Sequence, residues 1–215
     1  MGAPGGTLVP RPSIAHVGTD QAYAAVVLAG GGGRRLGGRT KPALPVAGRP
    51  MLHRVLAAVA DAAPRVVVGP PGLPLPPGTV RTQERPPGGG PVPATAAGLA
   101  QVPAGIPYVA LLAADLPVLT TAAVTALRRA LAGTGADGAV FVDDTGRRQW
   151  LCGVWRAAPL REALSGGRAG ALGAVLGGLA VTGVRAERGV PPPWFDCDTD
   201  ADLRIVEEWV DGDAG

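Results

Sequence analysis

The sequence predicts a single α/β domain in three layers, with a mostly parallel sheet and a mixed hairpin edge. Continuous apolar runs at 23–29 (YAAVVLA) and 108–114 (YVALLAA) are typical of strands that are buried on both faces. Apolar residues at helical spacing occur at 51–61, where Pro50 suits the first helical position, and at 122–132. This alternation of strand, loop and helix favours a parallel sheet with helices on both faces, and ligands bind such sheets at the carboxyl ends of the strands.

The other elements are justified by shorter patterns along the chain. Two strand-like runs flank the turn sequence DDTG, which indicates a hairpin over 138–156. In chain order we further expect strands at 65–69 and 79–82, a helix at 93–101, short helices at 157–164 and 169–178, a strand at 179–187, and a loop with an amphipathic helix over 191–210. We expect 1–21 to be a disordered leader, 22–210 to form the domain and 211–215 to be a flexible tail.

Composition excludes several classes of protein. The 215 residues are 47% hydrophobic, which suffices for a sizeable core. The net charge is +3 and no run of arginines exceeds two, which argues against nucleic-acid binding. No uncharged apolar run reaches the roughly 20 residues of a membrane span, and the N-terminus has no apolar signal region. The two cysteines match no zinc or redox spacing, so we expect a cytoplasmic protein with reduced thiols.

The glycine-rich segment 28–41, LAGGGGRRLGGRTK, contains the only lysine of the chain, Lys41. Glycines directly after a buried strand let backbone N–H groups approach an anion, and phosphate is the usual ligand. The Walker A pattern fails because Thr40 precedes the lysine and Pro42 follows it, and no register satisfies the dinucleotide fingerprint GxGxxG. A compact ammonium enters a narrow phosphate site that a planar guanidinium does not fit, so we expect Lys41 to contact phosphate.

Four acidic residues are candidates for metal or base recognition. Asp115 ends the apolar run 108–114, where a Mg²⁺ ligand or a simple turn residue is expected. Asp196 and Asp198 are candidate metal ligands, and the alternative is that Asp198 or Thr199 only caps the last helix. Glu84 either accepts the N1–H and N2–H₂ donors of guanine or is a solvated loop residue.

These motifs together resemble the nucleotidyltransferases with a GT-A-like fold, and most closely the molybdenum cofactor guanylyltransferases. The glycine segment is similar to the family loop LAGGxxxRMGGxDK, with Leu36 in place of Met and Thr40 in place of Asp. The resemblance extends, in order, over PPGGGPVPATAAGL (86–99), LLAADLPVL (111–119), RQWLCGVW (148–155) and FDCDTDADL (195–203). It covers about residues 23–205 and implies a Rossmann-like fold of the nucleotide-diphospho-sugar transferase type.

The resemblance implies Mg²⁺-dependent transfer of GMP from GTP to the phosphate of molybdopterin, with release of pyrophosphate. It implies catalytic roles for Arg35, Lys41 and Asp115 and a metal site at Asp115 and Asp198. The nucleotide-binding residues expected are Leu28, Ala29, Gly30, Gly31, Lys41, Glu84 and Asp115, with Asp196, Gly37, Gly38 and Gly90 as further candidates. The expected partners are GTP, a molybdopterin-type acceptor and, transiently, a molybdoenzyme or a molybdopterin-handling protein, without nucleic acid or membrane.

Other functions remain open on the same residues. A cytidylyltransferase for the same cofactor, a phospholactate guanylyltransferase and a sugar-phosphate nucleotidyltransferase share this loop chemistry. Thr40, which replaces the family aspartate, also leaves open a non-catalytic cofactor-binding protein on the same fold.

Overall fold

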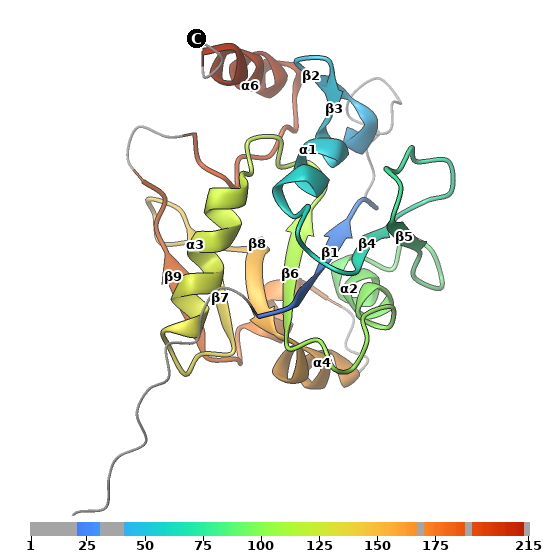
Figure 1. Ribbon diagram of the computed structural model, residues 1–215, viewed down its shortest axis with the longest axis vertical. Helices are drawn as coiled ribbons and strands as arrows, with labels where there is room; N and C mark the ends of the chain where they lie inside the picture. The colour runs from blue at the N-terminus through green and yellow to red at the C-terminus, as the bar shows by residue number, and fades with distance from the viewer. Residues whose placement is uncertain (1–20, 31–40, 167–169, 188–190, 213–215) are drawn as a thin grey trace, which may run out of the picture.

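The computed structural model describes residues 21–30, 41–166, 170–187 and 191–212 of the chain (Figure 1). The predicted leader and most of the glycine loop, 31–40, lie outside these residues. The strands are β1 (Tyr23–Leu28), β2 (Pro45–Val46), β3 (Arg49–Pro50), β4 (Arg65–Val68), β5 (Thr79–Thr82), β6 (Tyr108–Ala113), β7 (Gly138–Val142), β8 (Arg148–Arg156) and β9 (Val181–Val184). The helices are η1 (Lys41–Ala43), α1 (Met51–Ala58), α2 (Pro91–Leu99), α3 (Thr121–Ala132), α4 (Ala157–Ser165), α5 (Leu172–Leu176) and α6 (Asp200–Gly212).

Seven strands form one mixed sheet in the order β5-β4-β1-β6-β8-β7-β9. The strands β5, β4, β1 and β6 are mutually parallel, and β8 runs antiparallel to both β6 and β7. β9 returns parallel to β7 at the edge. The predicted mostly parallel sheet with a hairpin-built mixed part is therefore confirmed.

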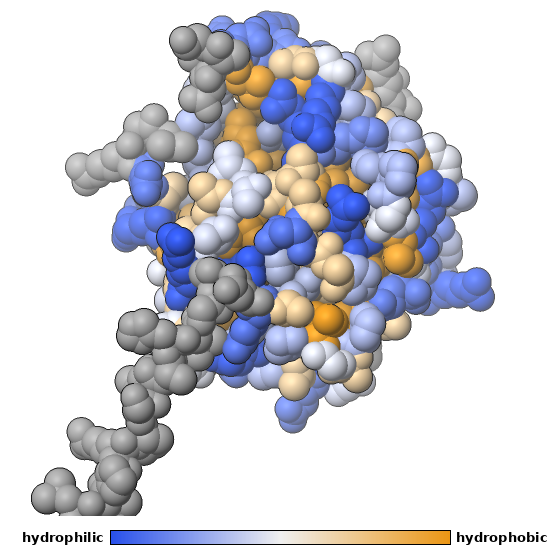
Figure 2. Space-filling view, in the orientation of Figure 1, coloured by the Kyte–Doolittle hydropathy of each residue, from blue (hydrophilic) through white to orange (hydrophobic). Residues whose placement is uncertain are grey.

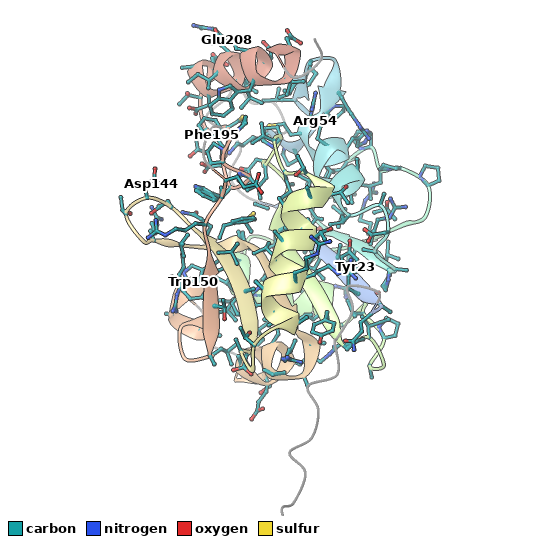
Figure 3. All side chains as sticks on the ribbon, turned by 60° about the vertical axis from the view of Figure 1, so that its left-hand side comes forward. Tyr23, Arg54, Asp144, Trp150, Phe195 and Glu208 are labelled. Atoms are coloured by element: carbon teal, nitrogen blue, oxygen red, sulfur yellow. The ribbon has the colours of Figure 1, made fainter. Side chains whose placement is uncertain are left out.

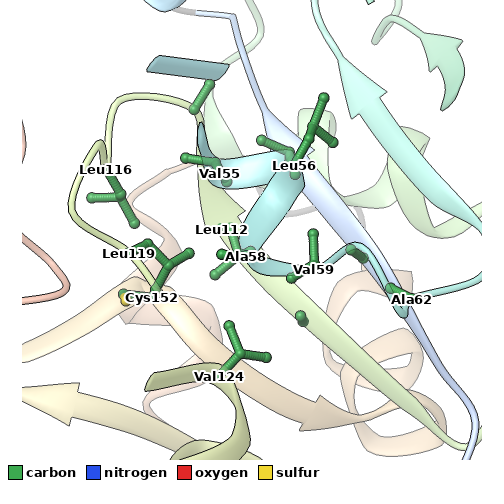
Figure 4. Close-up of a cluster of buried hydrophobic side chains, with 14 of the residues drawn as sticks. Val55, Leu56, Ala58, Val59, Ala62, Leu112, Leu116, Leu119, Val124 and Cys152 are labelled. Atoms are coloured by element: carbon green, nitrogen blue, oxygen red, sulfur yellow. The ribbon is translucent and has the colours of Figure 1, made fainter. Parts of the chain in front are cut away.

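Helices cover both faces of the sheet, which gives the predicted three layers. Side chains of α1 and α3 pack on one face with alternate residues of β1 such as Ala25 and Val27. Part of this core, including Val55, Leu112 and Val124, is shown in Figure 4. The intervening residues of β1 face the other layer, formed by α2, α4 and α5. Because both faces are covered, the central strands are apolar at every position.

The structure corrects the predicted path between the glycine loop and α1. The sequence pattern predicts loop up to Pro50, but the chain forms η1 and the short antiparallel pair β2–β3. Ala47 and Gly48 both have positive φ, 45° and 74°, which is the geometry of a tight two-residue hairpin turn. Pro50 therefore stands at the N-cap position rather than at the first helical position, and α1 begins at Met51. The helix predicted at 93–101 begins two residues earlier, at Pro91.

The C-terminal helix α6 lies with the β2–β3 pair above the carboxyl edge of the sheet (Figure 1). A separate apolar cluster, which includes Val46, Met51, Cys197 and Val206, joins them. Phe195, labelled in Figure 3, lies between the sheet and α6 and packs edge-on against Trp209 at 4.9 Å. This cluster fixes the segment that leads into α6 over the strand ends.

The surface of the described residues is mixed in character. Figure 2 shows hydrophilic side chains interspersed with hydrophobic ones over one face. Among the large hydrophobic side chains of the described residues, Val80 and Ile205 are the most exposed, each at 38%. None of the described helices is both long and apolar enough to span a bilayer.

Candidate active site

The candidate site lies at the carboxyl edge of the parallel strands. Leu28 of β1 pairs with Val68 of β4 and with Ala113 of β6, so these strands end at one level. Hydrogen bonds continue past the strand ends, from Ala29 N to Val68 O at 2.7 Å and from Ala114 N to Leu28 O at 3.0 Å. The segments that follow these strands, which include Gly30 and Asp115, therefore emerge side by side.

Lys41 opens η1, the first described turn after the glycine loop. The backbone N–H of Leu44 donates to the Lys41 carbonyl at 3.0 Å, and Pro42 and Leu44 are buried. Packing thus fixes the backbone of Lys41, while its side chain extends toward the end of β6.

The Lys41 ammonium bridges two carboxylates that are distant in sequence. Its Nζ donates to Asp115 Oδ2 and, at 2.8 Å, to Asp198 Oδ1. The side chains of Lys41 and Asp115 are 14% and 22% exposed, whereas that of Asp198 is 62% exposed. Burial alone lowers the pKa of Lys41, but the hydrogen bonds and charges of the two carboxylates outweigh it and raise the pKa above its ordinary value.

Asp198 is free to face Lys41 because its neighbours cap α6. Thr199 Oγ1 accepts from Asp202 N at 3.2 Å, and Asp202 Oδ2 accepts from Thr199 N at 2.7 Å. This reciprocal pair is a capping box. Of the two residues considered as the helix cap, Thr199 takes that place and Asp198 does not. The hydrogen bond from the Thr199 hydroxyl has the largest effect on the pKa of Asp202 and lowers it. Burial opposes this effect, but hydrogen bonds from backbone N–H groups add to it, so the pKa is lowered overall.

Asp196 adds a third carboxyl to the same region. Partial burial is the main cause that raises the pKa of Asp196, and the negative charges of Asp198 and Asp115 raise it further. The segment is held to the strand end by a backbone bond of 3.4 Å from Cys197 N to Asp115 O. Cys197 itself is buried, which raises the pKa of its thiol to about 12, so it is an unreactive packing residue as expected.

Glu84 follows β5 and is buried, with only 7% of its surface exposed, so the solvated-loop interpretation is wrong. Its Oε1 accepts from Gly88 N at 2.9 Å, which clamps the glycine turn before α2. Gly88 and Gly90 have φ of 81° and 93°, values that residues other than glycine rarely adopt. The turn ends at Gly90, which stands at the N-cap of α2.

The structure thus brings Lys41, Asp115 and Asp198 into contact, with Asp196 nearby. Leu28, Ala29 and Gly30 belong to the same strand ends. The candidates Gly31, Arg35, Gly37 and Gly38 lie outside the described residues. Sequence reasoning missed Asp202 and Gly88; the spacing of Thr199 and Asp202 in TDAD was the signal for the first.

The two carboxylates suit a hard divalent cation. Among the described residues, no group of three His, Cys, Asp or Glu side chains has metal-binding geometry. Mg²⁺ commonly takes only one or two carboxylates and completes its shell with water and substrate phosphates. Asp115 and Asp198, already held on one shared cation, fit that ligand set.

Solved structures support the fold. Molybdopterin-guanine dinucleotide biosynthesis protein A from Archaeoglobus fulgidus superposes with a TM-score of 0.68 at 20% identity, covering 88% of this chain and 99% of that protein. 2-C-methyl-D-erythritol 4-phosphate cytidylyltransferase from Thermus thermophilus superposes with a TM-score of 0.65 at 23% identity, covering 86% and 98%. At these identities the likeness concerns the fold. A search of curated proteins gave no significant match.

A sequence-family model, described as the MobA-like NTP transferase domain, matches residues 25–180. That range contains Lys41, Glu84 and Asp115, all of β4, β5 and β6, and β1 from Ala25 onward. It covers well over half of the chain and agrees with the architecture of the solved neighbours. The chain belongs to the MobA-like NTP transferase family and is an enzyme of the nucleotidyltransferase class.

Proposed function

We propose that this enzyme transfers GMP from GTP to the phosphate of a molybdopterin-type acceptor and releases pyrophosphate. The observation that carries the proposal is the Lys41 ammonium held between Asp115 and Asp198 at the strand ends, directly after a glycine loop. A cation and carboxylates at this edge are what a triphosphate with its counterion requires. The family match to a MobA-like domain favours the guanylyl reaction over the other transfers considered.

In this reaction an acceptor phosphate oxygen forms a new bond to the α-phosphorus of GTP. The bond from the α-phosphorus to the oxygen that bridges it to the β-phosphate breaks, and that oxygen leaves with pyrophosphate. The acceptor phosphate is already ionised near neutral pH, so the step needs no general base. Lys41 and, in the glycine loop, Arg35 and the backbone N–H groups would stabilise the negative charge on the triphosphate and on the leaving pyrophosphate.

Asp115 and Asp198 would hold Mg²⁺. When bound, the ion neutralises phosphate charge and keeps the triphosphate in line for attack. Asp196 lies near this pair, and burial together with the charges of Asp198 and Asp115 raises its pKa. Asp198 is largely exposed, which would let an acceptor phosphate approach the pair from its side.

Glu84 supports the choice of guanine. Its burial and its bond to Gly88 hold the carboxylate in one place at the edge that receives the nucleotide. A carboxylate oxygen accepts more than one hydrogen bond, so Glu84 retains the capacity to accept the paired N1–H and N2–H₂ donors of guanine. Cytosine presents one donor beside an acceptor, and the acceptor would face the carboxylate unfavourably.

Thermal unfolding with each of the four nucleoside triphosphates and Mg²⁺ tests this proposal. GTP is expected to raise the melting temperature clearly more than ATP, CTP or UTP at equal concentration. A ligand that binds only the folded state stabilises it, and the nucleotide that binds most tightly stabilises it most. An equal or larger rise with CTP would contradict the guanylyl assignment and support the cytidylyl alternative, whose fold is also represented among the structural neighbours.

A further inference from the structure

Lys41 satisfies both candidate metal ligands in the ligand-free protein. Its Nζ donates to one oxygen of Asp115 and to one oxygen of Asp198, the latter at 2.8 Å. Lys41 is 14% exposed and its backbone is fixed by η1, so the ammonium is seated within the site. The position between the two carboxylates is therefore taken by the enzyme's own cation.

A divalent cation bridged by Asp115 and Asp198 would lie where the Lys41 ammonium now lies, in contact with both carboxylates. The positive charges of the ammonium and the metal would repel each other strongly at such short range. The metal and Lys41 therefore compete for one position. Lys41 can leave it without rearrangement of the fold, since a lysine stem is flexible and only its terminal group is engaged.

We propose that Lys41 is an internal substitute for the metal, which keeps the site closed to divalent cations until a triphosphate arrives. The triphosphate offers Lys41 a new anionic partner, and the vacated carboxylates then accept the cation that accompanies the phosphates. Metal alone binds weakly, and metal and triphosphate bind cooperatively. The part played by the triphosphate rests on the proposed function, whereas the closure of the carboxylates by Lys41 does not.

The composition of the chain makes a direct test possible. Lys41 is the only lysine among 215 residues, so selective ¹⁵N-lysine labelling gives one side-chain ammonium signal in the NMR spectrum of the unmodified protein. We expect Mg²⁺ alone to leave this signal in place and Mg²⁺ with inorganic tripolyphosphate to shift it. Displacement of the signal by Mg²⁺ alone at the same concentration, or no shift with Mg²⁺ and tripolyphosphate, would overturn the proposal.

Metal binding without any phosphate gives a second test. Free Mn²⁺ is measured by electron paramagnetic resonance during titration of the wild type and of Lys41→Met. Removal of the ammonium is expected to tighten Mn²⁺ binding about ten-fold or more, because a like charge next to the metal is lost. The control is Arg65→Met, which removes one positive charge at the start of β4, the opposite edge of the sheet.

The double variant Lys41→Met/Asp115→Asn identifies where the added metal binds. It should lose the increase in Mn²⁺ affinity that Lys41→Met produces, since one of the two carboxylates is removed. A gain that persists in the double variant, that also appears in Arg65→Met, or that is absent from Lys41→Met would overturn the proposal. Tripolyphosphate and Mn²⁺ contain no base, so these results are independent of whether the enzyme uses GTP; failure of GTP to bind would contradict the proposed function alone.

Discussion

The two ends of β1 each carry a cation paired with carboxylate, and they are built differently. At the amino end, Arg128 pairs with Asp61 at 3.3 Å, donates to the Gln21 carbonyl at 3.0 Å and lies 4.2 Å from the centre of the Tyr23 ring. The Tyr23 hydroxyl also donates to Asp61. At the carboxyl end, a single flexible lysine bridges Asp115 and Asp198, with Asp196 close by.

The difference separates a structural ion pair from a binding site. Arg128 is fixed by its planar group, by an aromatic ring and by a backbone acceptor, and among the described residues it forms an ion pair with Asp61. Among the described residues, Lys41 faces three carboxyl groups, those of Asp115, Asp198 and Asp196, and its side chain hydrogen bonds through Nζ. A cluster with several carboxylates around one lysine, whose stem has many rotamers, is suited to exchange that cation for a ligand, whereas the amino-end cluster is suited to hold the chain in place.

The largest expected difference between the two ends of β1 appears when one carboxylate is removed from each in turn. Asp115→Asn should lower turnover by about 10² to 10³-fold, because preorganised charge at the reacting phosphates is lost, while the melting temperature changes little. Asp61→Asn should leave turnover unchanged and cost about 1 kcal/mol or less, as is usual for a partly exposed pair. Pyrophosphate release and thermal unfolding measure the two effects. A loss of turnover in both variants, or in neither, would contradict the separation of roles.

Reciprocal exchange of the two cations sharpens the same comparison. Lys41→Arg should lower turnover by about 10²-fold, because a planar guanidinium does not fit a site built for a compact ammonium. Arg128→Lys should instead lower the melting temperature with turnover retained, because a lysine cannot reproduce the stacked fork. Full activity in Lys41→Arg would show that only the charge of residue 41 matters.

A third prediction concerns the glycine turn beside the site. Glu84→Gln keeps an oxygen that accepts from Gly88 N but removes the carboxylate charge. We expect the preference for GTP over CTP to fall by about ten-fold or more while triphosphate binding remains, as measured by calorimetric titration of both nucleotides with Mg²⁺. An unchanged preference would assign base recognition to backbone groups of the turn.

The smallest effect is expected at the cap of α6. Thr199→Ala should cost about 1 kcal/mol of folding stability, and Asp202→Asn about 0.5 kcal/mol at neutral pH, since Asp202 is partly exposed and solvent screens its charge. The folded-state pKa of Asp202 is lowered, so its contribution is present above the unfolded value of 3.8 and is lost as the pH falls through the lowered value. The difference in chemical stability between wild type and Asp202→Asn should therefore vanish in strong acid; a constant difference would argue against a charged cap.

Much of the fold could be predicted because its central strands are buried on both faces. The runs at 23–29 and 108–114 carry no polar residue that would allow another interpretation. The β2–β3 pair was missed because strands of two residues, each with a proline, have no periodicity; tertiary packing against α6 supports them. Their turn at Ala47–Gly48 had only a weak sequence signal.

The site could be predicted in part for the same reason. Parallel strands end at one edge, so residues that follow them, such as Asp115 and Glu84, must lie on that edge. The contacts between Lys41 and the two aspartates could not be predicted, since 74 and 157 residues separate the partners and the path of each side chain depends on packing. The burial of Glu84 likewise arises from a turn whose closure needs Gly88 in a positive-φ conformation.

The most direct test of the central claim is the reaction itself, followed by mass spectrometry of the product and by pyrophosphate release. The purified enzyme is incubated with molybdopterin, Mg²⁺ and GTP or CTP, with Asp115→Asn as the matched inactive control. We predict pyrophosphate and an acceptor that carries a GMP unit with GTP, and neither with Asp115→Asn. Release of pyrophosphate from CTP in preference to GTP, or no transfer from any of the four triphosphates to this acceptor, would contradict the assignment.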